Sequence, residues 1–114
     1  MEFALTREQE LVKQMVREFA ENEVKPLAAE IDETERFPME TVKKMAKYGM
    51  MGIPFSKEYG GAGGDTLSYI LAVEELSKVC GTTGVILSAH TSLCASVIDK
   101  YGTEEHKQKY LIPL

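Results

Sequence analysis

Apolar residues recur with helical spacing along most of the chain, and the first run is the clearest. It starts at Thr6 and Gln9, whose spacing predicts a capping box at a helix N-terminus. Pro26 lacks an N–H group, so this helix either ends near Glu23 or kinks; we expect a kink, with the helix continuing through Leu27 and Ile31. The predicted buried face repeats at i, i+1, i+4 and i+5 and comprises Leu11, Val12, Met15, Val16, Phe19 and Ala20, opposite a polar face of Glu8, Lys13, Arg17 and Glu21.

Two further helices follow the same logic. The second opens at Pro38 and ends at Gly49 and Gly52, and its predicted inward residues are Met39, Val42, Met45 and Ala46. The third is predicted over residues 66–79, with Leu67, Ile70, Leu71, Val73 and Leu76 inward and Ser68, Glu75 and Lys78 in solvent. Glu74 and Glu75 are adjacent, so they point about 100° apart and do not share an acid–base site. We expect this pair to be solvated or structurally bonded.

A glycine-rich loop joins the second helix to the third. Four of the five residues 60–64 are glycine, which makes the loop costly to order. A phosphate cradle is the first functional interpretation, but no Gly-Lys-Ser/Thr follows and no apolar strand precedes the loop. We therefore predict a tight corner that ends with Asp65 or Thr66 capping the next helix.

The fourth predicted helix is unusual because no residue from Val79 to Ile98 carries a fixed charge. The glycines in residues 81–84 predict a break, followed by a helix over residues 85–100. Residues 79–98 contain eleven apolar residues, two glycines and seven Thr, Ser or His residues, a polar content that argues against a membrane span. Such a helix is expected to be buried on several faces, and part of it to meet another domain or a ligand. His90 lies within it without a local carboxylate or nucleophile, so a hydrogen-bonded core imidazole is favoured over catalysis.

The predicted fold class is all-α: one domain over residues 1–114, a bundle of about five helices. The last helix runs from a Thr103 cap to Pro113, and no segment has a convincing strand pattern. The 44% apolar and 27% charged residues are ordinary for a soluble globular domain. Thirteen basic and eighteen acidic residues give a net charge of −5 without a basic cluster, which argues against nucleic acid and anionic membrane surfaces as partners.

The cysteines and the N-terminus indicate a compartment. Cys80 and Cys94 belong to no Cys-x-x-Cys motif and no disulfide framework, which is typical of a reduced, cytosolic-type environment. The first residues form neither a signal peptide nor an Arg-rich transit segment, so we predict a cytoplasmic protein. No metal site is expected.

Five motifs, in order, resemble the N-terminal α-helical domain of the acyl-CoA dehydrogenases. They are TREQ at 6–9, FP at 37–38, GIP at 52–54 leading to EYGGAGGD at 58–65, VEEL at 73–76, and KYGT at 100–103. Each is weak alone, but the set covers essentially the whole chain. The run GVILSAHTSL at 84–93 looks most like the short-chain, butyryl-CoA type.

The resemblance implies a flavoprotein oxidoreductase of fatty acid metabolism. Members use FAD to dehydrogenate an acyl-CoA at its α and β carbons and pass the electrons to an electron-transfer flavoprotein, and the full-length enzyme is expected to be a homotetramer. The catalytic glutamate and nearly all FAD contacts belong to a middle β domain and a C-terminal helical domain, which would lie outside this chain. This chain alone is therefore expected to be inactive, with no catalytic or cofactor-binding residue and no bound FAD.

The same resemblance implies a role for the fourth helix as part of the wall of the acyl-chain cavity. The candidate wall residues are Ile86, His90 and Leu93, which an α-helix places on one side at i, i+4 and i+7. Two alternatives remain open. One is different chemistry on the same fold, in an acyl-CoA oxidase or a glutaryl-type dehydrogenase; the other is a stand-alone helical interaction module.

Overall fold

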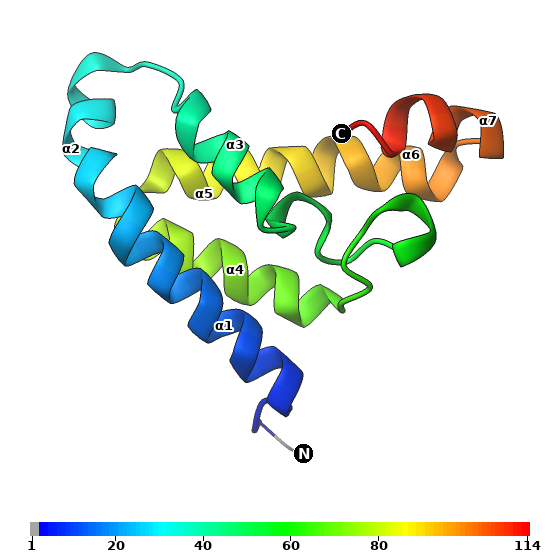
Figure 1. Cartoon of the computed structure of the whole chain (residues 1–114), viewed down its shortest axis with the longest axis horizontal. Helices are drawn as coiled ribbons and strands as arrows, with labels where there is room; N and C mark the ends of the chain where they lie inside the picture. The colour runs from blue at the N-terminus through cyan, green and yellow to red at the C-terminus, as the bar shows by residue number, and fades with distance from the viewer. Residues whose placement is uncertain (1–2) are drawn as a thin grey trace.

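Helices build the domain in the computed structural model, which describes residues 3–114 (Figure 1). These helices form five continuous helical rods. The first rod comprises α1 (Arg7–Phe19), the π-helical turn η1 (Ala20–Val24) and α2 (Lys25–Thr34). The second is α3 (Met39–Lys47), the third α4 (Thr66–Val79), and the fifth α7 (Glu104–His106) with the π turn η5 (Lys107–Leu111). The described residues contain no strand, which confirms the all-α prediction.

The fourth rod, here called the long helix, runs without interruption over Gly81–Tyr101. It comprises α5 (Gly81–Ser88), the π segment η4 (Ala89–Ala95) and α6 (Ser96–Tyr101). The predicted break at residues 81–84 is wrong, because the chain bends at the extended residue Cys80 instead. Gly84 serves a different purpose: a Cβ there would collide with the Ser77 side chain, so the glycine allows α5 to approach α4 closely.

Local signals predicted several other helix ends correctly. Thr6 and Gln9 form the predicted capping box, and the Asp65 carboxylate accepts a 2.7 Å hydrogen bond from the Ser68 N–H. The first helix continues through Pro26, as predicted, with the π turn η1 just before the proline. A π turn relieves the proline's missing donor and its clash with the preceding turn.

The glycine corner is a tight, internally bonded loop, as predicted. The N–H groups of Ala62 and Gly64 donate to the carbonyls of Gly52 and Ile53, at 2.9 and 2.8 Å. A Cβ at Gly61 would collide with the Phe55 carbonyl, so only glycine fits there. Two short 3-10 turns, η2 (Met50–Gly52) and η3 (Lys57–Tyr59), complete the connection.

The main core lies where α1 packs against α4 and α4 against α5. Its buried members are Val16, Phe19, Ala20, Val24, Met45, Met50, Ile53, Tyr69, Ala72, Leu76, Cys80 and Leu87. A second, smaller cluster of Phe55, Ala95 and Leu111 joins the glycine corner to the last rod.

Several predicted faces are wrong. The inward predictions Leu11, Met15, Met39, Leu67 and Ile70 are all exposed by 40% or more. Conversely, Ser68 and Glu75, predicted to face solvent, are only 4% and 3% exposed. A wide apolar arc does not say which of its edges faces the core, and polar residues can be buried when another helix supplies their partners.

Glu75 is one of these buried polar residues, and basic side chains bind its carboxylate. Arg17 donates to both Glu75 carboxylate oxygens, at 3.3 and 3.2 Å, and Lys78 donates to one of them at 3.2 Å. Burial opposes ionisation of Glu75, but these cations outweigh it and hold its pKa below the usual range. Lys78 also lies 3.5 Å from Glu74, so the glutamate pair is structurally bonded, as expected.

Candidate functional site

The long helix presents two different sides. One side packs into the domain through Thr83, Gly84, Leu87, Thr91 and Ala95, all of them buried. The large exposed hydrophobic side chains, here called the outer residues, are Val85, Leu93, Val97 and Tyr101, which are 66%, 75%, 51% and 74% exposed. Burial on several faces was predicted, and in this chain it is wrong, because the other helices cover one side only. The outer residues are therefore available for contact with another domain or a ligand.

The predicted wall residues do not share one environment. Ile86 is half-buried and packs against the main core, and His90 is half-buried beside a cavity. Leu93 points away from the domain and is 75% exposed. The prediction assumed a regular α-helix from 86 to 93, but the π segment Ala89–Ala95 has i→i+5 bonds and turns less per residue. The rotation that accumulates separates Leu93 from His90.

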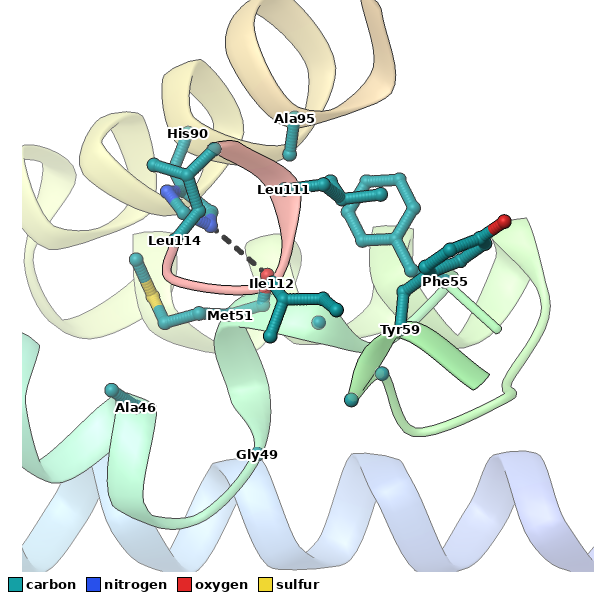
Figure 2. A pocket seen from close by; sticks show the side chains of 13 residues that line it. Ala46, Gly49, Met51, Phe55, Tyr59, His90, Ala95, Leu111, Ile112 and Leu114 are labelled. Carbon is teal, nitrogen blue, oxygen red and sulfur yellow. Dashed lines mark hydrogen bonds between the residues drawn. The ribbon is translucent and has the colours of Figure 1, made fainter. Parts of the chain in front are cut away.

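His90 is a hydrogen-bonded histidine that faces the domain, as the residues alone suggested. Its Nε2 lies 3.1 Å from the Met51 carbonyl oxygen, a contact drawn as a dashed line in Figure 2. The carbonyl only accepts, so Nε2 carries the proton and donates it. Burial lowers the pKa of His90, while the bond to Met51 opposes this shift, so the ring is neutral at pH 7.

The cavity beside His90 is small. Figure 2 shows it between the long helix, the glycine corner with Phe55 and Tyr59, and the last turn of the chain with Leu111 and Leu114. Its volume is about 100 Å³. Ligand pockets usually measure about 300–1,000 Å³, so the cavity has room for a few waters or a small apolar group and not for a whole coenzyme.

A hydrogen bond ties the glycine corner to the last rod. The Tyr59 hydroxyl donates to the Glu104 carboxylate over 2.6 Å, and Lys107 lies 5.1 Å from the centre of the Tyr59 ring. The bond to Glu104 raises the pKa of Tyr59 to about 12 and lowers that of Glu104. Both groups therefore stay in the bonded protonation state at neutral pH.

Sequence reasoning missed Tyr69, which is 5% exposed and bonds the long helix through its hydroxyl. A signal was present, because Tyr69, Ala72 and Leu76 share one face at i, i+3 and i+7. Among residues 3–114, no group of three His, Cys, Asp or Glu side chains is placed to hold a metal ion.

The long helix also meets a simple test for membrane spans. It has 21 residues and a mean hydropathy of 1.3 in its most apolar window, so by length and composition alone it could cross a membrane. The core helix of a soluble protein can have the same length and composition. Of the most apolar stretch of this helix, 28% is buried inside the domain. The argument against a span from its polar residues stays a prediction.

Comparisons with known proteins agree with one another. The family model described as "Acyl-CoA dehydrogenase, N-terminal domain" matches residues 6–114. The chain aligns over its whole length with the short-chain specific acyl-CoA dehydrogenase of Clostridium acetobutylicum at 87% identity. The alignment covers 30% of that relative. The solved structure of butyryl-CoA dehydrogenase from Megasphaera elsdenii matches 99% of the chain at 40% identity with a TM-score of 0.93.

A second solved structure is described as "Electron transferring flavoprotein of Acidaminococcus fermentans: Towards a mechanism of flavin-based electron bifurcation". One of its chains matches 99% of this chain at 52% identity with a TM-score of 0.96. The chain spans about 30% of the length of each of these relatives.

Proposed function

The chain belongs to the acyl-CoA dehydrogenase family, as its N-terminal domain, and we propose that it forms one wall of the acyl-chain cavity in such an enzyme. The enzyme would be an FAD-dependent oxidoreductase that dehydrogenates a short-chain acyl-CoA and passes electrons to an electron-transfer flavoprotein. The observation that carries this proposal is the long helix, which is uncharged over residues 79–98 and keeps its outer residues uncovered.

The outer residues suit an acyl chain chemically. An alkyl chain has no hydrogen-bonding group, so it is best bound by Val85, Leu93 and Val97, the outer residues without a polar atom, and each buried methylene is worth about 0.8 kcal/mol. Leu93 is the first candidate for direct contact because it is 75% exposed and apolar. Ile86 and His90 are proposed to support this wall from behind, since both lie closer to the domain.

The described residues do not fit FAD. The N–H groups of the glycine corner, the best phosphate cradle by composition, already donate to carbonyls at residues 52–57. A phosphate would have to break the loop to bind there. We therefore assign flavin binding and the chemical step to a middle β domain and a C-terminal helical domain, outside residues 1–114, and derive no step from this chain.

The remaining assignments rest on the sequence and on family membership. The enzyme would be a cytoplasmic homotetramer, with no membrane span and no nucleic acid partner. Its long helix would be covered by other parts of the enzyme, and this is consistent with the low buried share of that helix in the domain alone.

The test uses a longer protein that begins with this sequence. It should purify with bound flavin, and butyryl-CoA should reduce that flavin and support electron transfer to an electron-transfer flavoprotein. The 114-residue chain should be colourless in the same preparation. A longer protein that binds flavin but reacts with no acyl-CoA would refute the proposed activity. A flavin-loaded 114-residue chain would refute the assignment of flavin binding to the other two domains.

A further inference from the structure

The π segment in the long helix is not explained by a proline or a glycine. π helices are rare, occur mostly as single turns and are frequently found at functional sites. The π turn Ala20–Val24 precedes Pro26, which accounts for it locally. The segment Ala89–Ala95 contains neither proline nor glycine, so the side-chain hydrogen bonds around it are the remaining candidates for what stabilises its register.

A buried tyrosine supplies these contacts. Tyr69 in α4 places its hydroxyl 3.3 Å from the Ser88 carbonyl oxygen and 2.7 Å from the Ser92 Oγ. The carbonyl can only accept, so Tyr69 donates to Ser88, and the Ser92 hydroxyl donates to Tyr69. Ser96 then donates its own hydroxyl to the Ser92 carbonyl over 2.6 Å.

These bonds bracket the π segment. Ser88 is the residue immediately before it, Ser92 lies within it, and Ser96 follows it. The tyrosine hydroxyl therefore joins the last α-helical carbonyl to the middle of the π turn. A buried hydroxyl that is left unpaired is costly, so the arrangement favours the register in which both bonds form.

The register decides which side chains face outward. Within the π segment, Ala95 is 1% exposed and Leu93 is 75% exposed, and His90 reaches the Met51 carbonyl. In a regular α-helix, Leu93 would lie on the same side as Ile86, seven residues earlier. The π turn rotates Leu93 away from that side and into the outer residues.

We propose that Tyr69 is a positioning residue for acyl-chain selection: its hydroxyl fixes the π register of the long helix and thereby the direction of Leu93. The inference rests on the proposed function of that helix as a cavity wall. Tyr69 is 5% exposed and faces the core, so it acts through Ser88 and Ser92 and not by contact with a ligand.

The test variant is Tyr69→Phe, which removes only the hydroxyl, with Tyr48→Phe at a 55% exposed position as the matched control. In the 114-residue chain, amide hydrogen exchange over residues 88–96 should speed up by roughly tenfold in Tyr69→Phe while exchange in α1 stays unchanged. Tyr48→Phe should leave both regions unchanged. Ser92→Ala, which removes one partner at an exposed site, should act in the same direction and serves if Tyr69→Phe does not fold.

The functional readout is discrimination between acyl chains in the longer flavoprotein. The ratio of kcat/KM for butyryl-CoA over hexanoyl-CoA should fall by about 3- to 10-fold in Tyr69→Phe, because a loosened wall selects less sharply. Val16→Ala, a core change in α1, should lower the melting temperature without moving this ratio. A purely structural role for Tyr69 would behave like Val16→Ala.

The outcomes separate the two proposals. If the wild-type flavoprotein does not turn over any acyl-CoA, the proposed function fails whatever Tyr69 does. If it turns over butyryl-CoA and Tyr69→Phe, or Ser92→Ala in its place, leaves the ratio unchanged, the inference about Tyr69 is overturned. An unchanged ratio overturns it even when hydrogen exchange over residues 88–96 has increased.

Discussion

Two leucines in the long helix should respond very differently to the same substitution. Leu87 is 0% exposed and Leu93 is 75% exposed. Replacing a fully buried leucine by alanine costs about 2–5 kcal/mol, because the lost contacts leave a cavity. Leu93 has about a quarter of its surface covered, so the same change is worth only roughly 0.5 kcal/mol, given ~1.5–3 kcal/mol for full burial. The better helix propensity of alanine offsets a few tenths of that.

The assay is reversible urea and thermal unfolding of the 114-residue chain, followed by far-ultraviolet circular dichroism. Leu87→Ala should lower the melting temperature by roughly 10 °C or more, and Leu93→Ala by roughly 2 °C, since 1 kcal/mol corresponds to about 4–8 °C in a domain of this size. A loss of more than about 2 kcal/mol in Leu93→Ala would mean that Leu93 packs inside the domain. That result would refute both the π register and the proposed wall.

The Leu93→Ala substitution should also change which acyl chains the enzyme prefers. In the longer flavoprotein, Leu93→Ala should favour longer acyl chains over short ones by about 1–3 kcal/mol in transition-state binding for each methylene-sized gap, without altering flavin content. An unchanged chain-length profile, with wild-type turnover of butyryl-CoA, would exclude Leu93 from the wall.

Other predictions address the core, the corner and the surface. Arg17→Ala should lower the melting temperature more than Lys25→Ala, because Arg17 neutralises the buried Glu75 whereas Lys25 pairs with an exposed partner; equal losses would contradict this. Because the folded-state pKa of Glu75 is lowered, its ionisation stabilises the fold above pH 4.5, the usual glutamate value, and this contribution is lost as the pH falls through the folded pKa. Glu75→Gln should therefore flatten the acid limb of a stability–pH curve. Gly61→Ala should cost roughly 2 kcal/mol or more by backbone collision, whereas Gly81→Ala, in open space at a helix start, should gain about 0.5–1 kcal/mol in urea titrations. The outer residues should make the 114-residue chain bind hydrophobic dyes or self-associate, and a dye-silent monomer in sedimentation would argue against an exposed patch.

The number of helices and most of their ends could be predicted from the residues alone. The caps at Thr6, Asp65 and Thr103 each bond a residue three positions away, so the information lies within one turn. The glycine corner was also predictable, because four glycines in five residues have few other uses. Family membership followed from motifs spread along the chain, and the family model confirms it.

The buried side of each helix, in contrast, depends on how the helices pack against one another. Glu75 is buried because Arg17, 58 residues away, supplies its counter-charge, and Leu11 is exposed because no helix covers its side of α1. The direction of Leu93 depends on Tyr69, which selects a π register that no spacing rule for α-helices contains. Local hydrogen bonds can be inferred from neighbours in sequence, but burial and register depend on partners that only folding brings together.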